Sequence, residues 1–149
     1  EVQDNAVPSG SALAAQALLS MAGYTMDFDW QEIAEDLLAS QRDKILRYPL
    51  GFGVWLQAAD LAVGPTSEIA LVRESEKDPL DSFFIPLWST YRPRLLLAGK
   101  TLPLTEEDPE LLADRSPMEG KPTAYVCRDF VCLQPTTDPE QFADQLEDL

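Results

Sequence analysis

The spacing of hydrophobic side chains changes near residue 64, where a helical period gives way to the short apolar runs that are typical of strands. Before this point, apolar residues recur three or four positions apart in three stretches, at about residues 9–21, 29–45 and 49–61. The pair Gly64-Pro65 then interrupts the pattern. Residues 1–63 are therefore predicted to form a helical segment, and residues 64–149 a small α/β domain.

Local signals mark the ends of the first two helices. Ser9 is a favourable N-cap for the first helix, and Gly23 is its expected stop. Asp29, followed three residues later by Glu32, forms an acidic variant of the capping box for the second helix. The apolar stripes of the second and third helices are Trp30, Ile33, Ala34, Leu37, Leu38 and Ile45, then Phe52, Trp55, Leu56 and Ala59.

The second domain opens with a predicted strand, helix and strand at residues 68–73, 79–91 and 94–98. This order predicts a right-handed crossover that joins two parallel strands. Pro86 lies inside the helical stretch and lacks a backbone N–H, so it predicts a kink or a break into two short pieces.

The rest of the domain adds a loop, a hairpin and a final helix. Residues 101–120 carry three prolines and predict a loop with at most a short helix near 109–114. Residues 124–133 predict a hairpin, and Asp138 with Pro139 predicts the start of a last helix. The predicted fold class is therefore α/β (α+β), with helices followed by a small mixed sheet in β-α-β then β-β-α order.

Both cysteines lie in the predicted hairpin, where a turn centred on Asp129-Phe130 places Cys127 opposite Cys132. Opposed residues have Cβ atoms about 4.5–5.5 Å apart, so only a close pair with local twist can form a disulfide. The sequence leaves that bond open. The favoured interpretation is that both thiols are small apolar residues on the buried side, and the alternative is a redox pair.

The charge of the chain disfavours two classes of partner. The net charge is −15, from 26 acidic and 11 basic residues, so the surface repels phosphate backbones and anionic lipids. Neither nucleic acid nor membrane binding is expected. We interpret the acidity as a source of solubility, with halophilic adaptation or a basic protein partner as alternatives.

The absence of histidine restricts the chemistry further. It removes imidazole from any nucleophile activation or zinc site in this chain. The two cysteines do not have Cys-x-x-Cys spacing, and Gly51-Phe52-Gly53 lacks the third glycine of a dinucleotide site. No catalytic residue, metal ligand or cofactor is predicted.

Two segments carry a family resemblance. Residues 120–132, Gly-Lys-Pro-Thr-Ala-Tyr-Val-Cys-Arg-Asp-Phe-Val-Cys, with Pro-Thr-Thr-Asp-Pro-Glu at 135–140, resemble the C-terminus of large thioredoxin-domain-containing proteins related to a spermatogenesis-associated thioredoxin-like protein. Residues 4–10, Asp-Asn-Ala-Val-Pro-Ser-Gly, resemble the start of a late helix in that family's helical-hairpin barrel, which is similar to six-hairpin glycosidases. Because the chain opens at Glu1 rather than Met, we expect a fragment of a longer protein.

The resemblance implies a loop that faces a substrate in the parent barrel. Its polar members are Asp4, Asn5, Ser9 and Ser11, where Ser11 replaces the usual Asn of the family. The resemblance also implies a thioredoxin-like outline for the second domain, with Lys121-Pro122 as a candidate cis bond and trans as the default.

The sequence thus predicts a non-catalytic, structural C-terminal region of a larger cytoplasmic protein of uncertain activity. Its partner is the rest of the parent chain, with a homodimer expected when the region is isolated. Two rival functions stay open. In one, the Asp4–Ser11 loop contributes substrate-binding groups to a carbohydrate-active barrel, and in the other, Cys127 and Cys132 form a redox or interaction module.

Overall fold

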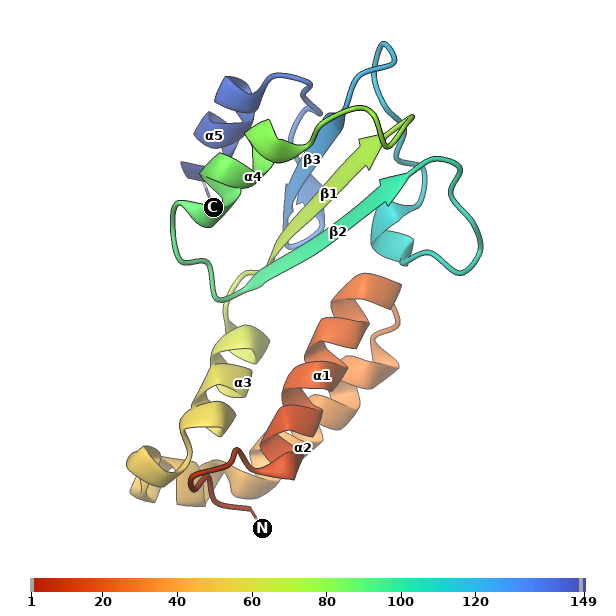
Figure 1. Ribbon diagram of the computed structural model, residues 1–149. Helices are drawn as coiled ribbons and strands as arrows, with labels where there is room; N and C mark the ends of the chain where they lie inside the picture. The colour runs from red at the N-terminus through yellow and green to blue at the C-terminus, as the bar shows by residue number, and fades with distance from the viewer. Residues whose placement is uncertain (1, 148) are drawn as a thin grey trace. The chain divides into compact units, whose positions relative to one another are not determined.

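The computed structural model describes residues 2–147 and 149, and it divides the chain into two compact units, Glu1–Gly64 and Pro65–Leu149. The first unit is helical, and the second contains a four-stranded sheet with helices (Figure 1). The fold is therefore mixed α and β, as the hydrophobic pattern predicts.

Helix α1 spans Gly10–Thr25 and begins as predicted. The Ser9 hydroxyl accepts a hydrogen bond from the backbone N–H of Ala12 at 3.4 Å. The predicted stop is wrong, because the helix continues through Gly23 and ends where Met26 adopts the left-handed conformation, with φ 54°. Gly23 is buried inside the helix, so this glycine serves close packing rather than termination.

Helix α2 spans Asp29–Arg47 and does not use the predicted capping box. Phe28 takes the N-cap position, and its backbone carbonyl accepts from the N–H of Glu32 at 3.1 Å. Asp29 lies inside the helix, and its N–H donates to the Asp27 carboxylate at 3.1 Å. The acidic residues of the first turn therefore favour the helix through its dipole rather than through reciprocal capping.

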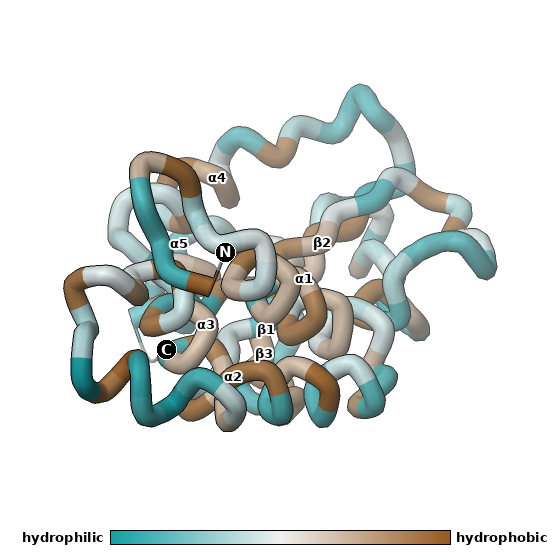
Figure 2. Tube along the Cα trace, turned by 90° about the horizontal axis from the view of Figure 1, so that it is seen from below, coloured by the Kyte–Doolittle hydropathy of each residue, from teal (hydrophilic) through white to brown (hydrophobic). Residues whose placement is uncertain are grey.

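A 3₁₀ turn at Pro49–Gly51 leads into helix α3, Gly53–Val63. The helices α1, α2 and α3 pack together around small side chains and one tryptophan. The buried core of this unit consists of Ala12, Ala15, Leu19, Ala34, Ile45, Phe52, Trp55 and Ala58. The predicted stripes are only partly buried, because Trp30, Ile33 and Leu56 are exposed, and Figure 2 shows hydrophobic and hydrophilic residues along α2.

The sheet of the second unit has the strand order β2-β1-β3-β4. The strands are β1, Ser67–Arg73; β2, Leu95–Thr101; β3, Thr123–Arg128; and β4, Val131–Cys132. β1 pairs with β2 in parallel, and the pairs β1–β3 and β3–β4 are antiparallel. The predicted parallel pair and the hairpin are both present. β1 is central and buried along most of its length, as its continuous apolar run indicates.

Helices α4, Asp81–Trp88, and α5, Pro139–Glu147, cover one face of this sheet (Figure 1). Their contact includes an edge-to-face pair of Phe83 and Phe142, with ring centroids 5.4 Å apart. The predicted cap of the last helix is confirmed, because Asp138 Oδ1 accepts from the N–H of Glu140 at 2.9 Å. α4 is shorter than expected and ends two residues after Pro86, in line with the predicted break.

The long connection between β2 and β3 covers the opposite face of the sheet with a 3₁₀ turn, Glu110–Leu112. Leu111 and Leu112 are both buried. The predicted short helix is present here as this single turn. Leu102–Pro103 is the cis peptide bond recorded among the described residues, so Lys121–Pro122 keeps the trans default.

Candidate functional site at the hairpin disulfide

The β3–β4 hairpin closes through a two-residue turn that places its cysteines face to face. Asp129 and Phe130 both have positive φ, 47° and 63°. Two-residue hairpin turns with positive φ at both central residues match the twist of the flanking strands. Cys127 pairs with Cys132 across the strands, as the sequence predicts.

The structure joins Cys127 and Cys132 in a disulfide, with an S–S distance of 2.00 Å and Cα atoms 3.8 Å apart. The favoured interpretation of two buried thiols is therefore wrong. Cys127 is 2% exposed, but Cys132 lies on the exposed strand β4. The hairpin pairing could be inferred from the sequence, whereas the close approach of the two strands could not.

An arginine from the preceding loop lies against both sulfur atoms. Arg115 Nη2 is 3.5 Å from Cys127 Sγ and 3.4 Å from Cys132 Sγ. Its guanidinium also lies over the ring of Tyr125, 4.8 Å from the centroid, and its Nε donates to the carbonyl of Leu111 at 3.4 Å. Stacking and the carbonyl bond hold a positive charge beside the disulfide. Sequence reasoning missed Arg115, since it lies in an irregular loop.

Tyr125 fixes the loop that carries Arg115. Its hydroxyl donates to the carbonyl of Ser116 at 2.7 Å and accepts from the N–H of Ser116 at 3.2 Å. Tyr125 and Cys127 lie two positions apart on β3 and so point to the same face of the sheet. The arginine, the tyrosine ring and the disulfide therefore form one surface cluster.

The tip of the hairpin is bound to the segment that enters β1. Thr66 exchanges two hydrogen bonds with Asp129, from Asp129 N to the Thr66 carbonyl at 3.1 Å and from Thr66 N to Asp129 Oδ1 at 2.9 Å. Glu68 is fully buried, and its carboxylate accepts from the N–H of Phe130 at 3.0 Å and from the Thr66 hydroxyl. Asp129 therefore serves both the turn and the attachment of the hairpin to the segment before β1.

The polar loop near the N-terminus binds backbone N–H groups at the starts of two helices. Asp4 Oδ1 accepts from the N–H of Ser9 at 2.8 Å, and Oδ2 accepts from the N–H of Val54 in the first turn of α3 at 2.9 Å. Ser9 is buried as the cap of α1. Asn5 and Ser11 are exposed. Asp4 and Ser9 are therefore connected, but through structural hydrogen bonds.

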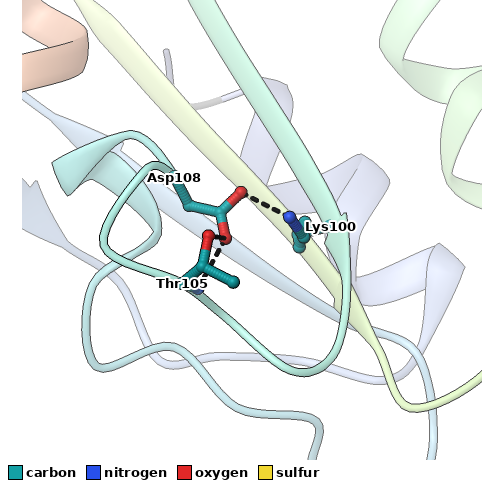
Figure 3. A network of polar contacts seen from close by, with 3 residues as sticks. All are labelled: Lys100, Thr105 and Asp108. Carbon is teal, nitrogen blue, oxygen red and sulfur yellow. Dashed lines mark hydrogen bonds and ion pairs between the residues drawn. The ribbon is translucent and has the colours of Figure 1, made fainter.

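A second polar network lies in the loop that follows β2 (Figure 3). Asp108 Oδ1 pairs with Lys100 Nζ at 2.6 Å, and Oδ2 accepts from the N–H and the hydroxyl of Thr105 at 2.7 and 3.0 Å. The hydrogen bond from Lys100, with that from the Thr105 N–H, lowers the pKa of Asp108 below its ordinary value. Thr105 and Asp108 stand three positions apart, and this spacing is a local signal in the sequence for the network.

A pocket of about 460 Å³ in the second unit collects three arginines, Arg92, Arg94 and Arg128. The Arg92 guanidinium donates to the carbonyls of Leu87 and Leu146 at 3.0 and 3.5 Å, near the C-terminal ends of α4 and α5. Cations at helix C-termini are favourable because of the helix dipole. We therefore assign Arg92 to helix packing.

Neither a metal site nor a membrane span is found in the described part of the chain. No group of three or more potential metal ligands among its Cys, Asp and Glu side chains is close enough to hold an ion. Across residues 2–147 and 149, every helix is too short or too polar to cross a bilayer.

The chain is similar to proteins named spermatogenesis-associated protein 20. It is 26% identical to the human protein and 24% identical to the protein of Rattus norvegicus, over 92% of this chain in each case. No protein-family profile matches the chain, and no solved structure gives a significant match. The chain spans 18% of the length of each of these relatives, so its similarity concerns one region of much longer proteins.

Proposed function

We propose that this chain is a non-catalytic, structural C-terminal region of a longer protein that resembles spermatogenesis-associated protein 20. The observation that carries the proposal is the use of Asp4. Both of its carboxylate oxygens accept backbone N–H groups at the starts of helices, which gives this side chain a structural use. The short share of the relatives' length that the chain covers agrees with a regional role.

An apolar groove supports packing against a further part of the parent protein. It lies between α2 and α3, has a volume of about 460 Å³ and has largely apolar walls. Leu46 and Val63 line it and are 69% and 85% exposed. Helices of a barrel bury such faces against their neighbours. The groove is therefore consistent with the end of a helical-hairpin barrel that continues into the parent chain.

The strand order supports a thioredoxin-like outline for the second unit. A parallel β1–β2 pair with a helical crossover, followed by the antiparallel strands β3 and β4 and a helix, follows the order expected from the resemblance. Residues 76–79, Glu-Lys-Asp-Pro, precede α4 where a redox-active relative would carry its dithiol motif. We infer a shared architecture without that catalytic centre.

Glycoside hydrolysis and epimerisation assays on the chain test the proposal. We expect no turnover above background with a panel of neutral and acidic sugars. The decisive comparison uses Asp4→Asn, which keeps the size of the side chain and removes its charge. The structural proposal would be wrong if the unsubstituted chain turned over a sugar, Asp4→Asn abolished this activity and Asn5→Ala left it intact. That result would assign a substrate-binding role to the loop.

A further inference from the structure

We propose that the Cys127–Cys132 disulfide is a thiol-exchange site, which accepts two electrons from an exposed dithiol and is attacked at Cys132. The inference goes beyond the structural role proposed above and does not depend on it. It rests on three observations: the unequal exposure of the two cysteines, the arginine that contacts both sulfurs, and the attachment of the hairpin by other bonds.

Access decides which sulfur is attacked. A thiolate attacks one sulfur of a disulfide and expels the other. Cys127 is 2% exposed and faces the loop that covers the sheet, whereas Cys132 is exposed on the edge strand β4. An incoming thiolate therefore reaches Cys132, and Cys127 is the leaving group.

The exchange balances with a dithiol as the reductant. Its first thiolate forms a bond to Cys132 Sγ, the Cys127–Cys132 bond breaks, and Cys127 leaves with the electron pair as a thiolate. The second thiolate of the reductant then attacks its own bound sulfur and expels the Cys132 thiolate. The reductant ends as a disulfide, and the two cysteines end as thiols after each takes up a proton from solvent.

Arg115 supplies the charge that this step needs. The expelled Cys127 thiolate forms beside a guanidinium group that already lies 3.5 Å from its sulfur. A nearby cation stabilises a thiolate and lowers the barrier to its departure. The ring of Tyr125 and the carbonyl of Leu111 hold the guanidinium in position before the reaction begins.

The hairpin does not need the disulfide to keep its place. The bonds between Thr66 and Asp129, and between Glu68 and the N–H of Phe130, bind its tip to the entry of β1. The two cysteines are only five positions apart, and disulfides that close short loops stabilise a fold least. Reduction is therefore expected without unfolding, which is a requirement for exchange in the native state.

The test is reduction of the native chain by dithiothreitol, followed by alkylation and mass analysis. Reduced glutathione is a second probe, and acid quenching at early times traps its mixed disulfide with the chain. We expect reduction without denaturant and glutathione on Cys132, with Cys127 alkylated. Arg115→Met should slow the reduction by about tenfold, and Arg115→Lys should restore most of the rate. In the reduced chain, Arg115→Met should also shift the pH profile of thiol alkylation upward.

Arg47→Met is the matched control. Arg47 stacks on Tyr48, with its guanidinium 5.3 Å from the ring centroid, so the substitution removes the same charge and the same kind of stacking in the helical unit, which contains neither cysteine. Equal effects of Arg47→Met and Arg115→Met would overturn the proposal. Reduction only under unfolding conditions, or glutathione on Cys127, would overturn it as well.

Discussion

Individual polar side chains hold together loop segments that have no regular secondary structure. Asp4 and Asp108 show the same device, a carboxylate whose two oxygens are occupied by different donors. Asp4 connects the N-terminal loop to α3, and Asp108 connects the loop after β2 to Lys100 of that strand. In both cases the acid looks like an ordinary surface residue in the sequence, because its donors are backbone N–H groups or side chains set by the fold.

Replacing Asp4 tests this structural role. Asp4→Ala leaves the backbone N–H groups of Ser9 and Val54 without their acceptor, so we expect the free energy of unfolding to fall by about 1–2 kcal/mol. Urea unfolding followed by circular dichroism measures the change. Asn5→Ala, in the exposed part of the same loop, should alter stability by less than about 0.5 kcal/mol. Equal effects of the two substitutions would contradict the capping role.

The hydrogen bonds of Asp108 predict that the stability of the fold depends on pH in the acid range. Since folding lowers the pKa of Asp108, its contribution to stability is fully present above the ordinary carboxyl pKa of 3.8 and is lost as the pH falls through the lower folded value. Asp108→Asn should therefore be less stable than the unsubstituted chain at neutral pH, and this difference should shrink below about pH 4. Thermal unfolding from pH 2 to pH 7 measures it.

The control for this pH dependence is Asp114→Asn, which changes the charge equally at an exposed position of the same connection. Its stability difference from the unsubstituted chain should not follow the Asp108 profile. A difference for Asp108→Asn that stays constant down to pH 2 would show that the Lys100 and Thr105 bonds do not stabilise the ionised form.

The hydrophobic pattern predicts correctly which segments are helices and which are strands, but it predicts their boundaries less accurately. The stretches predicted as helices and as paired strands all adopt that structure, because amphipathic spacing and apolar runs are local properties. The errors lie at Gly23 and Asp29, where a buried packing position and a backbone-defined N-cap override common local preferences. The core of the second unit depends instead on contacts that are distant in the sequence, among them those of α4 with α5 and of both helices with the sheet.

The packing of α4 against α5 gives a prediction on stability. Phe142 is fully buried and meets Phe83 edge to face, so Phe142→Ala should lower the free energy of unfolding by about 3–5 kcal/mol. Ile85→Ala on the exposed side of α4, 75% exposed, is the control and should cost under about 0.5 kcal/mol. Chemical denaturation monitored by tryptophan fluorescence distinguishes the two. A loss near 1 kcal/mol for Phe142→Ala would mean that α5 is only weakly attached.

At the scale of the whole molecule, the apolar groove between α2 and α3 predicts that the chain self-associates when no other protein segment covers the groove. We expect a concentration-dependent dimer in sedimentation velocity, because large exposed apolar surfaces favour association. Leu46→Glu in the groove should shift the chain to monomer, whereas Ile85→Glu on the second unit, at similar exposure, should not. A strict monomer at high concentration, without binding of a hydrophobic dye, would count against the groove as an interface.

The sequence alone determined the order of the elements, the mixed α/β class, the hairpin with its opposed cysteines, and the exclusion of imidazole chemistry. These features depend on local periodicity, turn residues and composition, which can be seen within short windows. Only the tertiary structure decided that Arg115 lies on the disulfide, that Asp4 closes two helix starts, and that one cysteine is exposed. Each of these depends on how segments that are distant in the sequence pack within their unit, and no local preference encodes it.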